Sequence, residues 1–370
     1  MADGYRVEVR AVVLRSPDEP MRVERIWLRD VASGEVRVRI DATGVCHSDL
    51  SLARGVLDQA TPAVLGHEAC GTVVETAPDV TDLAVGDRVI LLWISPCGQC
   101  AACERGDAHL CEHGSDRSAA PYALDAVGTP IYPGLGVGSF AEQTVVAASA
   151  AVRVPGDVDT EQAALLGCAV TTGVGAVTTT AAVAPGASVV VLGLGGVGLS
   201  AVQGARLSCA GTVIAVDRNP DKAALATKVG ADHFVPADDG MRRAIRALNG
   251  GQGVDYAFDC VGSARTIRDA WSMTRRGGTT CVVGIGGNDD RVTFSALELF
   301  HFARTLTGCV AGSLDARRDL PRYFDHVRAG RLDLPAMVTG HGGLADVEPA
   351  LADMAAGNGI RTLIAPEASR

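Results

Sequence analysis

Short apolar runs separated by turn residues fill roughly the first 154 positions of the chain. Runs of this length, rich in Val and Ile and bounded by Gly, Pro and Asp, are typical of β-strands. We interpret as strands residues 7–14, 35–42, 71–75, 88–92 and 142–146. The pattern predicts an all-β, barrel-like domain.

The pattern changes near residue 155, where compact and wholly apolar runs begin to alternate with segments of helical period. Strands that are apolar on both faces and alternate with helices predict a parallel, doubly wound α/β sheet. We expect strands at 189–192, 212–216, 254–259 and 280–284, with helices such as 222–229 and 264–273 between them. Beyond about residue 309 we expect helices at 320–328 and 344–354 and a last strand at 361–364.

Length and charge limit the classes of function. A chain of 370 residues exceeds the size of one hydrophobic core, so two domains are expected. The net charge of -10 comes without a Lys/Arg-rich run, which disfavours a nucleic-acid partner. The most apolar stretch, residues 183–202, contains five glycines and a proline and does not read as a membrane span. With no apolar signal region after Met1, we expect a cytoplasmic protein.

Four of the eleven cysteines occur close together in a loop of Gly, Ala and charged residues. Four thiolates can surround one zinc ion and leave no position for a substrate, which is typical of a structural site. The ligands would be Cys97, Cys100, Cys103 and Cys111. Two disulfides are the alternative, but a reducing compartment disfavours them. Five further cysteines lie in apolar or Gly-rich surroundings and are expected to be small buried hydrophobic residues: Cys70, Cys209, Cys260, Cys281 and Cys309.

A glycine-rich loop follows the predicted strand 189–192 and directly precedes a helix. It reads Gly193-Leu194-Gly195-Gly196-Val197-Gly198, the G-x-G-x-x-G arrangement that binds a dinucleotide pyrophosphate at a helix N-terminus. Asp217 ends the next strand, where a carboxylate accepts hydrogen bonds from the ribose hydroxyls and repels a 2′-phosphate. This favours NAD(H), although the adjacent Arg218 could contact a 2′-phosphate.

Three further metal-ligand types stand at predicted turns: Cys46, His67 and Cys168. Two thiolates and one imidazole would leave the fourth position of a zinc ion open, as in catalytic sites. Spacing alone does not show that the three residues meet. A buried cysteine or a hydrogen-bonded core histidine is the alternative for each of them.

The neighbourhoods of these residues resemble zinc-dependent medium-chain alcohol dehydrogenases over nearly the whole chain. The matching segments, in the order and spacing of that family, are Gly44-Val45-Cys46-His47-Ser48-Asp49, Gly66-His67-Glu68 with Gly71, the four-cysteine loop, Gly167-Cys168 with Thr171-Thr172-Gly173, and the glycine-rich loop. The resemblance implies a GroES-like β-barrel catalytic domain, residues 1–155 and 310–370, and a Rossmann cofactor domain, residues 156–309.

By the same resemblance, Cys46, His67 and Cys168 bind a catalytic zinc, which with the structural ion makes two per chain. As a Lewis acid, zinc lowers the pKa of a bound alcohol, so that the alkoxide forms near neutral pH and its carbon gives hydride to NAD. Asp49 would orient the zinc-bound imidazole, and Glu68 would lie behind the metal. A surface carboxylate is the default alternative for both residues.

Ser48 would accept the alcohol proton. Many relatives end this relay in a histidine three positions later, where this chain has Ser51, a poor base. The terminal acceptor is therefore open, with water or His47 as candidates.

The resemblance also suggests contacts to the cofactor and the substrate. His47 and Arg361 resemble pyrophosphate contacts, Thr172 belongs to a matched cofactor segment, and Lys222 resembles a lysine near the adenosine ribose. An exposed surface position is the alternative for Arg361 and Lys222. Positions that would line an apolar alcohol site are Leu57, Trp93 and Phe140, for which core packing is an equal explanation.

The expected reaction interconverts a primary alcohol, for which aromatic and other apolar alcohols are candidates, and its aldehyde. One alternative is oxidation of an S-hydroxymethyl thiol formed from formaldehyde, for which Arg117 is a candidate cation at the pocket mouth. Others are a nicotinoprotein that retains NAD(H), and a zinc- and cofactor-binding protein without activity. The family also implies a homodimer formed at the sheet edge near residues 305–310.

Overall fold

The structure is a computed structural model that describes residues 4–366 and divides into two compact units. The first unit runs to Cys168 and also contains Asp315–Arg328 and the chain from Val338 onward. The second unit comprises Ala169–Leu314 and Ala329–Met337. The first unit extends beyond the expected boundary at residue 155 because helix α3 (Thr160–Leu165) packs on three of its strands.

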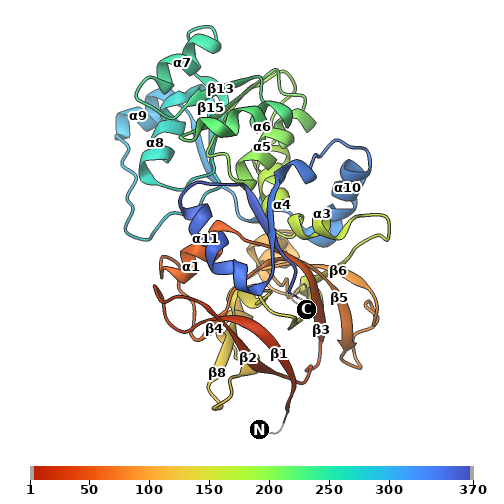
Figure 1. Ribbon diagram of the computed structural model, residues 1–370. Coiled ribbons are helices and arrows are strands. Elements are labelled where there is room, and N and C mark those ends of the chain that lie inside the picture. Colours follow the sequence, from red (N-terminus) through yellow and green to blue (C-terminus); the bar gives the residue numbers. More distant parts are fainter. Residues whose placement is uncertain (1–3, 367–370) are drawn as a thin grey trace. The chain divides into compact units, whose positions relative to one another are not determined.

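The first unit is built mainly from antiparallel strands (Figure 1). Its strands are β1 (Tyr5–Leu14), β2 (Arg22–Arg29), β3 (Glu35–Gly44), β4 (Ala63–Val64), β5 (Glu68–Thr76), β6 (Arg88–Leu91), β7 (Ala123–Leu124), β8 (Pro130–Pro133), β9 (Gln143–Ala147), β10 (Ala151–Arg153), β17 (Val338–Gly342) and β18 (Arg361–Ile364). Its other helices are α1 (His47–Ala53), α2 (Ala101–Glu104), α10 (Ala316–Arg328) and α11 (Val347–Ala355).

These strands form a closed barrel and a second sheet. The barrel order is β1-β2-β7-β8-β4, and the sheet order is β10-β6-β5-β3-β18-β17 with β9 also paired to β3. In Figure 1 the blue C-terminal strand β18 lies beside the red β3, and Leu363 pairs with Gly44. The last strand of the chain is thus placed directly next to the segment that leads to Cys46.

The second unit is a parallel sheet with the strand order β13-β12-β11-β14-β15-β16. Its strands are β11 (Ser188–Leu192), β12 (Thr212–Asp217), β13 (His233–Pro236), β14 (Val254–Asp259), β15 (Thr274–Val282) and β16 (Thr305–Gly308). Its helices are α4 (Ala169–Gly175), α5 (Gly196–Leu207), α6 (Ala223–Lys228), α7 (Met241–Leu248), α8 (Ala264–Met273) and α9 (Ala296–Phe302). The central strand β11 is buried at every position, as expected of a parallel sheet covered on both faces.

The architecture agrees with the predicted fold class, a barrel-like domain joined to a doubly wound parallel sheet. Among the five cysteines expected to be buried, Cys70, Cys281 and Cys309 are buried and Cys260 is partly buried. The expectation was wrong for Cys209, which is exposed just after the end of α5. Within residues 4–366, no helix has the length and apolar composition needed to cross a membrane.

One buried carboxylate in the first unit is held between two arginines. Glu35, at the start of β3, is 5% exposed and lies 2.5 Å from Arg29 Nη1 and 2.7 Å from Arg117 Nη1. Its Oε2 also accepts the Ala32 N–H at 2.9 Å. Burial raises the pKa of Glu35, but the hydrogen bonds from Arg29 and Ala32 outweigh burial and lower the pKa to about 2.

We expect Glu35 to make stability depend on pH. Because its pKa is about 2 in the folded state and 4.5 ordinarily, its contribution is fully present above about pH 4.5 and is lost as the pH falls toward 2. Glu35→Gln should lower the free energy of unfolding by on the order of 2 to 3 kcal/mol at pH 7. Urea titrations of both proteins between pH 7 and pH 3 measure this difference, which should shrink with acidity.

Glu8→Gln is the matched control, because the Arg25–Glu8 pair is exposed by 73% and 46% and should contribute well under about 1 kcal/mol. A Glu35→Gln difference that stayed constant down to pH 3 would contradict the assigned pKa.

Candidate functional site

The three predicted ligands of an open metal site meet in the first unit. Cys46 precedes α1, His67 lies between β4 and β5, and Cys168 follows α3. Their ligand atoms all lie within 4.8 Å of one another, and all three residues are buried. Nε2 of His67 has no hydrogen-bond partner among the described residues, so a buried nitrogen lone pair is left for a metal ion. The donor set therefore fits zinc.

Asp49 fixes the geometry of this trio through hydrogen bonds to two of its members. Its Oδ1 lies 2.9 Å from His67 Nδ1 and accepts the Gly66 N–H at 3.0 Å, while Oδ2 accepts the Cys46 N–H at 3.0 Å. Asp49 is completely buried. A carboxylate on Nδ1 fixes the tautomer that presents Nε2 to a metal. Asp49 is therefore not the surface carboxylate that was the alternative from the sequence.

Charges around the trio favour a bound cation. A hydrogen bond from Cys168 and the positive charge of Arg361 lower the pKa of Cys46 well below its usual range. Burial lowers the pKa of His67, but the negative charges of Asp49 and Cys46 raise it by more, so it stands well above its ordinary value. The raised pKa means that the surroundings of His67 stabilise a positive charge, and a bound metal ion can supply that charge in place of the proton.

Arg361 is buried beside the trio rather than exposed. Its Nε lies 2.9 Å from Glu68 Oε1, and its Nη1 donates to the Val45 carbonyl at 3.1 Å. Nη2 lies 3.5 Å from Cys46 Sγ. Arg361 and Glu68 are only 4% and 0% exposed, so neither residue is the surface side chain that was considered from sequence. The expected contact of Arg361 with a pyrophosphate remains a prediction.

The four-cysteine loop forms a second cluster. The sulfur atoms of Cys97, Cys100, Cys103 and Cys111 all lie within 4.8 Å of one another, and all four are free thiols. Cys100 and Cys111 Sγ are 3.9 Å apart, close to the ~3.8 Å that a tetrahedron with Zn–S bonds of about 2.3 Å requires. Hydrogen bonds from the backbone N–H groups of Cys103 and Glu112 lower the pKa of Cys100 to about 6. The loop is arranged for a closed zinc site, and the disulfide alternative is not the state seen.

The glycine-rich loop of the second unit shows a reason for each glycine. Gly193 has φ +87°, a conformation that favours glycine, and makes the turn after β11. A Cβ on Gly195 would meet nothing within 4 Å, so the backbone is open to a ligand. A Cβ on Gly198 would lie 1.8 Å from the Gly193 carbonyl oxygen, so only glycine allows α5 to pack this closely. Gly196 and Val197 form the first turn of α5.

Asp217 ends β12 beside this loop. Its Oδ2 accepts the Leu194 N–H at 2.7 Å and lies 3.3 Å from Lys222 Nζ. Arg218, the residue after Asp217, is exposed. Lys222 is therefore bound to the predicted ribose carboxylate instead of being a fully solvated lysine, with its side chain 13% exposed.

The other predicted residues of the relay and the cofactor site range from buried to exposed. Ser48 is partly buried, and its hydroxyl lies 4.0 Å from Cys46 Sγ. His47 is exposed at the start of α1, and Thr172 is partly buried on α4. Ser51, where many relatives have a histidine, is 8% exposed.

Two of the three predicted substrate-lining residues are partly buried, and one is in the core. Phe140 is 0% exposed and lies in the barrel core, which agrees with the alternative explanation of core packing. Leu57 is packed against the same core, and Trp93 against a second core formed by β3, β5 and β6. Their contact with a substrate remains a prediction.

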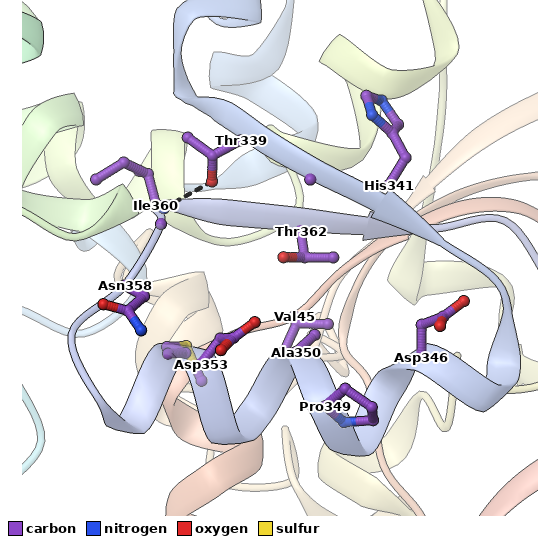
Figure 2. Close-up of a pocket in the computed structure, with 13 residues that line it drawn as sticks. Val45, Thr339, His341, Asp346, Pro349, Ala350, Asp353, Asn358, Ile360 and Thr362 are labelled. Carbon is purple, nitrogen blue, oxygen red and sulfur yellow. Dashed lines mark hydrogen bonds between the residues drawn. The ribbon is translucent and has the colours of Figure 1, made fainter.

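A cavity of about 360 Å³ lies in the first unit near the trio (Figure 2). It is bounded by α11, by β17 and β18 and by Val45, the residue before Cys46. Figure 2 shows Asp353 on α11, Asp346 directly before that helix, and the Ile360 N–H donating to Thr339 Oγ1, a bond of 2.8 Å. This pocket has no local signal in the sequence, because Val45 and the other lining residues are 294 or more positions apart.

Two apolar residues at the carboxyl ends of strands were also missed. Val261 and Ile285 follow β14 and β15 and are 46% and 48% exposed. Val261 touches the turn at Gly193, where an added Cβ would lie 2.6 Å from its Cγ2. Ligands of open parallel sheets bind at these strand ends. The signal was an apolar residue next to a glycine just beyond each strand.

Two family models and curated relatives match this chain. Residues 32–156 match the alcohol dehydrogenase GroES-like domain, and residues 196–328 match the zinc-binding dehydrogenase family. An S-(hydroxymethyl)glutathione dehydrogenase of Escherichia coli O1:K1 is 35% identical over 366 residues, covering 96% of this chain and 99% of the relative.

Solved structures give the same picture. The benzyl alcohol dehydrogenase of Acinetobacter calcoaceticus superposes with a TM-score of 0.89 at 28% identity, covering 98% of this chain and 100% of that one. A zinc-binding dehydrogenase of Sinorhizobium meliloti 1021, bound to NADP, has a TM-score of 0.80 at 26% identity with the same coverage. With the open and closed cysteine clusters and the glycine-rich loop, these matches show that the chain belongs to the zinc-dependent medium-chain alcohol dehydrogenase family.

Proposed function

We propose that the protein is a zinc- and NAD-dependent oxidoreductase that interconverts a primary alcohol and its aldehyde. The observation that carries the proposal is the trio of Cys46, His67 and Cys168, whose buried ligand atoms lie within 4.8 Å of one another and leave a fourth metal position free. A metal ion bound there would act as a Lewis acid on an alcohol oxygen. The second cluster, at Cys97 to Cys111, would hold a structural zinc ion.

The chain's own groups around the trio have separate tasks in this proposal. Asp49 keeps Nε2 of His67 directed at the site through the 2.9 Å contact with Nδ1. Arg361 neutralises Glu68, so that the buried carboxylate does not remain unpaired behind the ligands. Ser48, whose hydroxyl lies 4.0 Å from Cys46 Sγ, is the candidate to take the alcohol proton.

We favour NAD over NADP as the hydride acceptor. Asp217 presents a carboxylate at the end of β12, fixed by Leu194 N–H and by Lys222, where it would accept the ribose hydroxyls. The same charge would repel a 2′-phosphate. The exposed Arg218 and the NADP bound to the Sinorhizobium meliloti relative argue for the other cofactor, so the choice depends on which of the two charges dominates.

A second candidate substrate is an S-hydroxymethyl thiol, which the name of the 35% identical relative suggests. Such adducts carry carboxylates when the thiol is glutathione and need free cations for recognition. Arg117, the cation considered from sequence, is already bound to Glu35 at 2.7 Å with both side chains largely buried. This contact removes the specific support for a glutathione adduct and leaves an uncharged alcohol as the better substrate.

We also propose a homodimer, formed through an edge patch on the second unit. The edge patch consists of Leu297 and Phe300 on α9 together with Leu306 and Val310 at β16, exposed by 72%, 84%, 43% and 40%. β16 is the last strand in the order of the parallel sheet, so its outer edge carries backbone groups that a second copy can pair. Apolar side chains beside an open strand edge favour a second copy of the chain as the occupant.

Metal content and activity should change together in variants of the open site. The purified protein should hold about two zinc ions and form NADH from a primary-alcohol panel. Cys168→Ser should lower the content to about one zinc and abolish NADH formation, whereas Cys209→Ser, which alters an exposed cysteine, should change neither quantity. Metal analysis and NADH absorbance of the same samples measure both effects.

The same assay distinguishes the substrate candidates and the retained-cofactor alternative. Efficient turnover of an S-hydroxymethyl thiol, with little turnover of simple alcohols, would contradict the primary-alcohol proposal. An absorbance band of NADH in the protein as purified would identify a nicotinoprotein.

Cofactor preference should respond to Asp217. We expect Asp217→Asn to raise the ratio of kcat/KM for NADP to that for NAD at least about tenfold, which corresponds to about 1.4 kcal/mol, because the repulsion of a 2′-phosphate is removed. Asp221→Asn removes an exposed carboxylate four positions later and serves as the control. An unchanged ratio in Asp217→Asn would mean that this residue does not select the cofactor.

Oligomeric state should depend on the edge patch. The protein should sediment as a dimer of its 38.0 kDa chain, and Phe300→Glu should shift it to the monomer by placing a charge in the apolar contact. Val127→Glu, at a position that is 87% exposed in the first unit, should leave the dimer intact. Sedimentation of the unaltered protein as a 38.0 kDa species would refute the proposed interface.

A further inference from the structure

Three cysteines outside the metal clusters lie at the carboxyl ends of adjacent parallel strands. Cys260 directly follows β14, Cys281 is in β15, and Cys309 directly follows β16. Phe258 pairs with Cys281, and Cys281 pairs with Thr307, so Cys260 and Cys309 each lie two positions beyond a partner of Cys281. Because side chains on a strand alternate between its faces, this register places all three cysteines on one face of the sheet.

Two of these thiols are in direct contact. The side chains of Cys281 and Cys309 are hydrogen-bonded to each other, and the two residues are 0% and 8% exposed. The Cys309 N–H donates to the Val282 carbonyl at 2.9 Å, which extends the pairing of β15 and β16 past the last residue of β16. Cys260 acts on this pair only through its charge. The register brings both Cys260 and Cys309 to the face of Cys281, and the hydrogen bond to Cys281 favours Cys309 as its partner.

The surroundings make the two thiols unequal. The Thr180 hydroxyl donates to Cys309 Sγ at 3.2 Å and lies 2.8 Å from Ser313 Oγ. The hydrogen bond from Cys281 is the largest influence on Cys309 and lowers its pKa to about 7 against the opposing effect of burial. The same hydrogen bond, together with burial, raises the pKa of Cys281 far above its ordinary value. Cys309 is thus the thiolate of the pair, and Cys281 keeps the proton.

We propose that Cys281 and Cys309 form a reversible intrachain disulfide when the protein meets hydrogen peroxide. The Cys309 thiolate attacks one peroxide oxygen, the O–O bond breaks, and the leaving hydroxide takes up a proton as water. The resulting Cys309 sulfenic acid is attacked by the Cys281 sulfur. The S–S bond forms, the S–O bond breaks, and the leaving hydroxide takes the Cys281 proton as a second water. Two thiols lose two electrons to one peroxide.

The pair adjoins a backbone segment with unusual dihedral angles. Ala311, Gly312 and Ser313 have φ values of 47°, 70° and 52°, a run in the left-handed region that is uncommon for residues other than glycine. Ser313 is tied to Cys309 through Thr180. A disulfide removes the negative charge of the Cys309 thiolate, to which the Thr180 hydroxyl donates, so oxidation changes a contact of the segment that begins two residues after Cys309.

Peptide mapping of the zinc-loaded protein tests the proposal. After brief treatment with hydrogen peroxide and alkylation of free thiols, trypsin releases residues 277–291 with Cys281 and residues 305–317 with Cys309, each with one cysteine. The two peptides should appear linked, lighter by two hydrogens than their sum, and should separate after dithiothreitol. Cys209→Ser should give the same link, because that exposed cysteine takes no part.

Two variants identify the attacking sulfur. In Cys281→Ser, Cys309 has no partner and should remain a sulfenic acid that dimedone labels, whereas in Cys309→Ser the dimedone label on Cys281 should be absent. The proposal is overturned if both cysteines of the unaltered protein remain alkylated while Cys209 is oxidised. A link from Cys281 to Cys260, or a link that forms only after zinc has been released, would also overturn it.

Discussion

The geometry of the candidate metal site depends on one buried carboxylate that has three hydrogen-bond partners. Asp49 takes the Cys46 N–H on one oxygen and the Gly66 N–H and His67 Nδ1 on the other, so it joins α1 to the segment before β5. A buried carboxylate with its acceptor positions occupied in this way has little freedom to move. Two of the three candidate metal ligands are therefore held in position by a carboxylate that is not itself one of them.

A second buried charge is balanced by a distant part of the chain. Glu68 follows the ligand His67 directly, and its partner Arg361 comes from β18, which joins the sheet beside β3. Removing one member of a buried pair typically costs about 3 to 5 kcal/mol, because the other charge is left unpaired. The pairing of β18 with β3 thus brings the charge of Arg361 to Glu68, in addition to covering the core.

Local signals in the sequence were sufficient for the elements and for the chemistry of individual motifs. The apolar runs at β11, β12 and β14 and the glycine-rich loop follow from patterns within ten or fifteen residues. The burial of Arg361 was not predictable in this way, because an arginine at the start of a short strand gives no sign of a partner 293 positions earlier. The exposure of Cys209 was missed for the opposite reason: its surroundings are apolar in sequence, but α5 ends at Leu207 and the turn leaves the interior.

The position of Arg361 has a consequence for the order in which the protein is made. All three residues of the open site have been synthesised once Cys168 has left the ribosome, yet the positive charge that balances Glu68 comes from Arg361, 193 positions later. Until then Glu68 must stay hydrated or protonated, and the strand next to β3 is missing. The first unit can therefore reach its final form only after Arg361 has been synthesised, by which point the complete sequence of the second unit has already been produced.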